Sequence, residues 1–149
     1  MTDQTAQSSF SWGRAVVIGI GVSILTAIAA QIMMRTGLSP FPEPPSLAFA
    51  ETLAGRMLPL PAGLLFHTAY VTFWSLVYLR ASPRHDSVGV LLLAGVLWLG
   101  VLAVFFPLIG WGLAGTAIGA ALIPASAIPH LLFALLLRAG ERLLPPARG

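Results

Sequence analysis

The chain has no cysteine and very little charge. Charged residues make up 9% of its 149 residues, whereas an ordinary soluble domain has about 25%. The absence of cysteine excludes disulfides, thiolate metal sites, iron–sulfur clusters and a thiol nucleophile. The scarcity of charge argues against a water-soluble globule, because too few polar groups are present to cover its surface.

Lysine is also absent, and the eight basic residues are arginines that stand singly at the ends of apolar runs. The net charge of +3 therefore does not come from a basic patch of the kind that binds nucleic acid. Single arginines beside apolar runs are typical of membrane flanks. We expect the lipid bilayer, and not nucleic acid, to be the main partner.

Long uncharged runs dominate what is present, and 57% of the residues are hydrophobic. About 20 apolar residues, at about 1.5 Å each, cross a hydrocarbon core of about 30 Å. Such a run must be helical in lipid, and four segments are too few for a closed barrel. The sequence predicts an all-α, four-transmembrane-helix bundle in a single membrane domain over residues 1–149. The predicted spans are about 15–34, 61–79, 88–106 and 113–137.

Short turns at 80–87 and 107–112 join the last three runs. Connections this short require antiparallel neighbours, so we expect spans 2, 3 and 4 to lie side by side. The first residues, 1–10, are polar, and we expect a flexible N-terminus.

A longer link joins the first run to the second. It opens with the proline-rich segment 38–45, which lacks the backbone donors that a helix needs. Residues 46–58 then show helical spacing, with Ser46 as a candidate N-cap. The apolar positions at this spacing are Leu47, Ala50, Ala54 and Met57. We expect a short amphipathic helix over 46–58, on the external membrane surface or over the mouth of the bundle.

The arginines predict the orientation. With both termini inside, six arginines face the cytoplasm, and Arg35 and Arg56 face the other side. The positive-inside rule favours this N-in, C-in arrangement. The first run begins like a secretory signal after Arg14, but its 20 apolar residues are longer than a typical signal core. We therefore expect an uncleaved anchor.

Two ionisable side chains lie within the predicted spans, His67 in the second and His130 in the fourth. An ionisable residue within a membrane is a functional candidate, because its burial is costly and it usually faces the bundle interior or a wet cavity. Two interpretations stay open. Each imidazole either hydrogen-bonds between helices or binds a ligand, a proton or a cofactor such as haem, a quinone or a pigment.

An aromatic row shares one face of the second run. His67, Tyr70, Trp74 and Tyr78 follow at steps of three and four. This face could line a site for a flat hydrophobic ligand, although ordinary packing and interface anchoring produce the same row. The candidate ligand-binding residues are His67, His130, Tyr70 and Trp74, and whether a metal binds stays open.

Haem ligation by both histidines is disfavoured by their predicted depths. His67 lies six residues past Pro61, about 9 Å below the external face, and His130 lies seven before Leu137, about 10 Å above the internal face. In a core of about 30 Å the rings would be offset by about 10 Å. Ligation between two copies of one histidine in a dimer would avoid this offset.

The fourth run contains two prolines. Pro124 and Pro129 each remove a backbone donor and predict helix breaks that free the carbonyls of Ala120 and Ala125. His130 is a candidate partner for the carbonyls exposed there.

Catalytic signatures are missing from the sequence. There is no G-x-S-x-G, no H-E-x-x-H and no Walker loop. Ser126 and His130 lie four residues apart, but no acid is placed to orient the histidine. The sequence therefore gives no support for an enzyme.

Four segments occur in an order that resembles small uncharacterised four-span bacterial inner-membrane proteins with histidines in the second and fourth helices. The segments are ETLAG, LLFHTAYVTFWSLVY, PLIGWG and PHLLFALLL. The similarity covers roughly residues 46–137. It implies a four-helix fold and a place in the bacterial inner (cytoplasmic) membrane, and it brings no activity with it.

Three functions stay open. The first is a non-catalytic integral subunit or accessory protein of a larger inner-membrane assembly, or a homo-oligomer, because Gly115 and Gly119 form a small-xxx-small pattern that lets another helix approach closely. The second is a haem-, quinone- or pigment-binding redox protein that uses His67 or His130. The third is a small homodimeric transporter whose broken fourth span lines the path.

Overall fold

The structure, a computed structural model, describes residues 10–82 and 84–145, and helices are the only regular secondary structure in them. The elements in chain order are α1 (Trp12–Arg35), α2 (Pro45–Ala54), α3 (Leu60–Ala81), α4 (Ser87–Gly100), the π-helix η1 (Val101–Phe105), α5 (Phe106–Leu108), the 3-10 helix η2 (Leu113–Gly115) and α6 (Leu122–Leu143). Residues 1–9 of the predicted flexible segment 1–10 lie outside the described residues. Arg148 lies outside them too.

In the described part of the chain, four helical stretches are long and apolar enough to cross a membrane: α1, α3, the continuous stretch Ser87–Leu108 and α6. This confirms the predicted all-α, four-helix architecture, which is that of a multi-pass membrane protein. The first three predicted spans agree with these helices to within three residues at each end.

The fourth predicted span, 113–137, has the wrong boundaries. α6 begins at Leu122, and the preceding residues form a loop that contains η2. Within this loop φ is +54° at Ala114 and +76° at Gly115, which a right-handed helix does not allow. Gly115 is the last residue of the short 3-10 helix η2, and Gly119 lies in the loop before α6. The two residues therefore do not share a face of a spanning helix, and the helix-contact face predicted for them is wrong.

The predicted break at Pro124 is also wrong. Pro124 lies in the first turn of α6, where a backbone N–H would have no helical acceptor. The carbonyl of Ala120 is not free, because it accepts a hydrogen bond from the N–H of Ile123 at 3.2 Å. Pro129 lies inside α6, and the helix continues through it.

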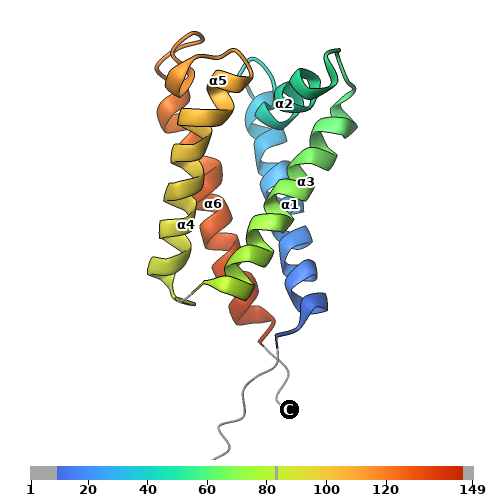
Figure 1. Ribbon diagram of the computed structural model, residues 1–149, viewed down its shortest axis with the longest axis vertical. Coiled ribbons are helices and arrows are strands. Elements are labelled where there is room, and N and C mark those ends of the chain that lie inside the picture. Colours follow the sequence, from blue (N-terminus) through green and yellow to red (C-terminus); the bar gives the residue numbers. More distant parts are fainter. Residues whose placement is uncertain (1–9, 83, 146–149) are drawn as a thin grey trace, which may run out of the picture.

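The spanning helices pack as two pairs, α1 with α3 and α4 with α6, and α1 joins the pairs by packing on α6 (Figure 1). We call the end that holds α2 the α2 end, and the end where α1 begins and α6 finishes the terminal end. The joining contact lies toward the terminal end, where Ile18 meets Gly140. Figure 1 shows α3 and α4 close together at their connecting turn and apart at the α2 end, so the bundle opens in that direction.

The two helices of the first pair approach closely at Gly19. A Cβ atom on Gly19 would lie 3.0 Å from the Cα of Thr72 and 3.3 Å from the Cβ of Ser75. Small residues permit such close packing between membrane helices. The structure therefore places a close helix contact between α1 and α3, at residues that the predicted pattern did not include.

α2 is shorter than the predicted helix over 46–58. Pro44, and not Ser46, is its N-cap, and Gly55 ends the helix in a left-handed conformation with φ +62°. Met57 lies beyond the helix and is 89% exposed, so it does not belong to a buried helical face.

α2 covers the open end of the bundle. It packs on α3, where a Cβ on Gly63 would lie 2.7 Å from the Cβ of Leu47. On its other side a small buried cluster joins it to α5 and α6: Ala48, Phe106, Trp111 and Leu122. Of the two placements that the sequence left open, the structure has the helix over the mouth of the bundle.

A larger buried cluster joins all four spanning helices. Its members are Ala15, Ile18, Val22, Val71, Tyr78, Leu79, Val90, Ala94, Leu97, Phe133, Ala134 and Leu137. The two clusters leave an unfilled space between the helix pairs, and this space is the candidate site.

Candidate ligand-binding site

A pocket of about 210 Å³ lies between the two helix pairs. α1, α3, α4, η1 and α6 form its walls, and residues 39–46 contribute to its lining. All four candidate residues line it: His67, Tyr70, Trp74 and His130. Two of the lining residues are exposed, Ile128 of α6 at 47% and Pro40 of the link before α2, so the pocket reaches the molecular surface beside them. The sequence thus identified residues that the fold brings together from two helices.

The two histidines lie at similar depths. His67 follows the first residue of α3 by seven positions and His130 follows the first residue of α6 by eight, about 10 Å and 12 Å along their helices. Both helices begin at the α2 end. The predicted offset of about 10 Å between the rings is wrong, because the fourth helix ends at Leu143 and not at Leu137.

His67 is held by polar groups of α1. Its Nε2 lies 3.0 Å from the hydroxyl oxygen of Thr26 and 3.2 Å from the carbonyl oxygen of Ser23. A carbonyl can only accept, so Nε2 carries the proton and donates. The Thr26 hydroxyl has an acceptor of its own, the carbonyl of Val22 at 2.9 Å. His67 therefore makes the interhelix hydrogen bond that was one of its two interpretations.

His130 is held by its own helix. Its Nδ1 lies 2.7 Å from the carbonyl oxygen of Ser126, one turn earlier in α6. Nδ1 must therefore carry the proton and donate. The position of Pro129 had indicated the carbonyl of Ala125 as the partner. The structure has the carbonyl of Ser126 in that role.

Trp98 of α4 completes the polar contacts beside His130. Its indole N–H lies 3.1 Å from the hydroxyl of Ser126 and 3.2 Å from the carbonyl of Ile123. The Ser126 hydroxyl in turn donates to the Ile123 carbonyl at 3.0 Å. These bonds join α4 to the first turns of α6 and use the Ser126 proton, which argues against a nucleophilic role for Ser126.

One nitrogen of each imidazole is left without a partner. Among the described residues, His67 Nδ1 and His130 Nε2 have no hydrogen bond, and neither is sealed from the space around it. When neutral, each ring offers a lone pair at this nitrogen. The two histidines that line the apolar pocket thus each keep one acceptor nitrogen that no described residue uses.

An aromatic cluster closes the pocket toward the α2 end. The Phe105 ring lies 5.6 Å from that of Tyr70, edge to face, and 4.6 Å from that of Phe49 in α2. Phe105 belongs to the π-helix η1, whose wide turn directly precedes Phe106-Pro107. A wider turn accommodates a proline ring that would clash with the preceding turn of a regular α-helix.

The size of the pocket limits what it can hold. A volume of about 210 Å³ exceeds the roughly 150 Å³ that accommodates a benzene ring but is below the roughly 300–1,000 Å³ of drug-sized sites. The enclosed space therefore suits a single-ring head group better than a tetrapyrrole such as haem. The described residues contain no group of three or more histidine and acidic side chains that could hold a metal ion.

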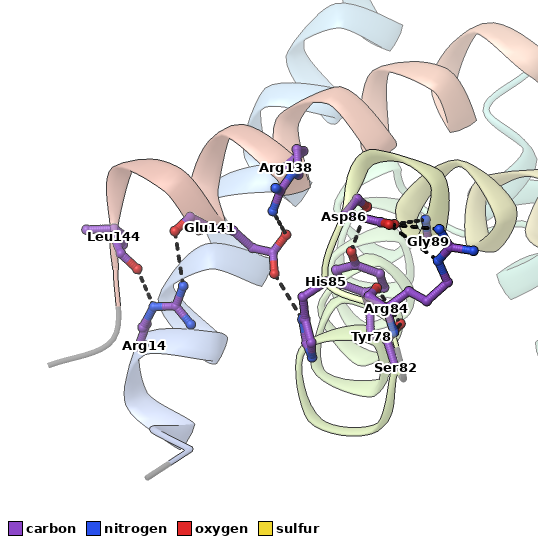
Figure 2. A network of polar contacts seen from close by, with 10 residues as sticks. All are labelled: Arg14, Tyr78, Ser82, Arg84, His85, Asp86, Gly89, Arg138, Glu141 and Leu144. Atoms are coloured by element: carbon purple, nitrogen blue, oxygen red, sulfur yellow. Dashed lines mark hydrogen bonds and ion pairs between the residues drawn. The ribbon is translucent and has the colours of Figure 1, made fainter. Parts of the chain in front are cut away.

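A second polar cluster lies at the terminal end, away from the pocket (Figure 2). The Glu141 side chain is only 8% exposed and contacts Arg138 Nη1 at 3.0 Å and His85 Nδ1 at 3.2 Å. Arg14 Nη2 donates to the Glu141 carbonyl at 3.2 Å, and its Nε donates to the carbonyl of Leu144. This cluster ties α1, α6 and the α3–α4 turn together, which fits a structural role.

Asp86 in the same turn is the N-cap of α4. Its carboxylate accepts from the N–H of Gly89 at 2.7 Å and pairs with Arg84 at 3.0 Å (Figure 2). The Gly89 N–H and the Arg84 guanidinium lower the pKa of the Asp86 carboxyl group, because both favour its charged form. The carboxylate therefore fixes the start of the third span.

Several residues of the site were not identified from the sequence. Ser23 and Thr26, which hold His67, are polar residues three apart in an otherwise apolar run, and this was the available signal. Trp98 and Phe105 carry no such signal, because their roles depend on which helix faces them.

No family model, curated protein or solved structure matches this chain. The resemblance to four-span bacterial inner-membrane proteins therefore stays a prediction, and the function has to be argued from the pocket.

Proposed function

We propose that the protein is a non-catalytic, multi-pass membrane protein that binds a small hydrophobic ligand with a single polar ring, of the quinone class, in this pocket. The observation that carries the proposal is the convergence of His67 and His130, from two helices, on one apolar pocket. Sites of this kind use apolar walls for affinity and a few polar groups for orientation.

Three features of the pocket support a quinone-class ligand. Its volume suits one ring, its aromatic side chains suit a flat head group, and its opening beside Ile128 leads to apolar surface. A hydrocarbon tail could leave through this opening while the ring stays in the pocket.

We also propose the bacterial inner membrane as the location, with both termini in the cytoplasm. Five arginines of the described chain lie on the segments at the terminal end: Arg14, Arg80, Arg84, Arg138 and Arg142. Arg35 and Arg56 lie on the segments at the α2 end. This asymmetry favours a cytoplasmic terminal end by the positive-inside rule.

The two other functions that the sequence left open have lost part of their support. The assembly hypothesis used Gly115 and Gly119 as a helix-contact face, and these residues lie in a loop. The transporter hypothesis used a broken fourth span, and α6 is continuous from Leu122. Both stay predictions.

Ligand binding can be tested on the purified protein in lipid nanodiscs, with decylubiquinone as the probe and tryptophan fluorescence as the readout. We expect saturable quenching, since Trp74 lines the pocket. Ala125→Phe fills the pocket from α6 and should weaken binding by about tenfold or more.

The matched control is Ala69→Phe, which adds the same ring to an exposed position on α3 outside the pocket. Its affinity should equal that of the wild type. Quenching that does not saturate in the wild-type protein, or that is equally strong in Ala125→Phe, would overturn the proposed function.

A further inference from the structure

The proton positions of the two pocket histidines are fixed by the backbone. His67 Nε2 faces the carbonyl of Ser23, and His130 Nδ1 faces the carbonyl of Ser126. A neutral imidazole has one N–H donor and one acceptor nitrogen. Since each donor is already committed to a carbonyl, each ring can offer a ligand only its acceptor: Nδ1 of His67 and Nε2 of His130.

Neighbouring donors are also occupied. The Thr26 hydroxyl donates to the carbonyl of Val22, and the Trp98 indole N–H and the Ser126 hydroxyl both point at the carbonyl of Ile123. Tyr70 stands beside Trp74 on α3, with ring centroids 6.4 Å apart. Its hydroxyl can donate or accept, so it serves a ligand of either kind.

The two oxidation states of a quinone-class ring differ in the groups they present. The quinone carries two carbonyl oxygens, which only accept, and the quinol carries two hydroxyl groups, which can donate. A carbonyl placed against an imidazole lone pair leaves two acceptors unpaired, and this is costly in a site with low water content. A hydroxyl in the same place forms a hydrogen bond.

We propose that the pocket binds the quinol form of its ligand in preference to the quinone form, with His67 Nδ1 and His130 Nε2 as acceptors for the ligand's hydroxyl groups. This inference rests on the proposed function, because it specifies which form of the ligand the same pocket takes. The protein thereby binds the reduced form of its ligand selectively.

The test compares decylubiquinol, kept reduced with dithionite, with decylubiquinone in air, on the same nanodiscs. The chain has no cysteine, so the reductant changes the probe and leaves the protein unaltered. We expect the quinol to bind about tenfold or more tightly, as one or two hydrogen bonds would give. A tenfold preference corresponds to a rise of about 30 mV in the potential of the bound two-electron couple.

His130→Phe and His67→Phe should each remove most of this preference, and they should do so by weakening quinol binding. The matched control is His85→Phe, the same exchange at a histidine of the terminal end, which should keep the full preference. Circular dichroism of each variant checks that the helices are intact.

Three results would overturn the inference. Equal affinity for the two forms in the wild-type protein, or tighter binding of the quinone, removes the preference while the proposed function stands. A preference that survives in both pocket variants shows that the histidines do not cause it. Failure of both forms to bind overturns the proposed function together with the inference.

Discussion

Threonine plays two opposite parts in the packing of α1 against α3. Thr26 accepts from His67 and donates to a backbone carbonyl, so its hydroxyl is fully used. Thr72, five residues beyond His67, has a buried hydroxyl with no hydrogen-bond partner in the part of the chain that the structure describes. A buried polar group stabilises a fold when it is paired and destabilises it when it is not.

We expect Thr26→Val to lower the free energy of unfolding by about 0.5–1.5 kcal/mol, because the imidazole of His67 loses its side-chain partner. Thr72→Val is the matched change at an unpaired hydroxyl, and it should leave stability unchanged or raise it. Thermal unfolding in detergent, followed by circular dichroism, measures both. A larger loss in Thr72→Val than in Thr26→Val would contradict the hydrogen bonding described here.

At the scale of elements, the packing of α2 on α3 requires a glycine at position 63 of α3. Gly63 of α3 lets Leu47 approach so closely that a Cβ atom would lie 2.8 Å from the Leu47 Cα. No rotamer change relieves a contact with backbone, so any larger residue must displace α2 itself.

Gly63→Ala should therefore destabilise the protein by about 1–3 kcal/mol, the usual cost of overpacking. Gly95→Ala in α4 is the control, because a Cβ there meets nothing within 4 Å. Alanine also favours a helix over glycine by about 1 kcal/mol, so this variant should be as stable as the wild type or more so. Equal thermal midpoints for the two variants would show that α2 does not pack tightly on α3.

The elements also show how far the sequence could predict the fold. Three of the spans were predicted closely, because uncharged runs bounded by arginine and proline have few alternatives in lipid. The face shared by His67, Tyr70 and Trp74 follows from helical spacing, and all three line the pocket. Local pattern was sufficient for these features.

The start of α6 could not be predicted in the same way. Residues 113–121 are as apolar as a span, and hydropathy does not separate a helix from an apolar loop that needs positive φ at Ala114 and Gly115. This error displaced the end of the span and separated His67 from His130 in depth. The pairing of Thr26 with His67 depends on how α1 packs against α3, and the periodicity of one helix does not show which residues of another helix it will face.

At the scale of the whole molecule, the ion pairs of the described residues all lie at the terminal end. The terminal end carries the Glu141 cluster and the Arg84–Asp86 pair, which tie three segments of the chain together (Figure 2). The α2 end is held by apolar packing of Ala48, Phe106, Trp111 and Leu122. Ion pairs thus hold the bundle together at the terminal end. At the α2 end the helix pairs lie apart, and α2 covers the space between them (Figure 1).

The proposed orientation predicts which end an impermeant reagent reaches. Since the natural chain has no cysteine, Met57→Cys at the α2 end and Ser87→Cys at the terminal end each introduce a unique, exposed thiol. In bacterial spheroplasts, a membrane-impermeant maleimide should label Met57→Cys at once and Ser87→Cys only after permeabilisation. The reverse pattern would show that the termini lie outside the cytoplasm.

The pocket opening beside Ile128 has a consequence for how occupancy is set. In the proposed membrane placement, a molecule that enters there passes from hydrocarbon to protein without crossing water, so its chemical potential is that of a solute dissolved in the bilayer. Occupancy then follows the mole ratio of ligand to phospholipid. Diluting such membranes with buffer should leave the occupancy of the pocket unchanged, whereas fusing them with ligand-free vesicles should lower it.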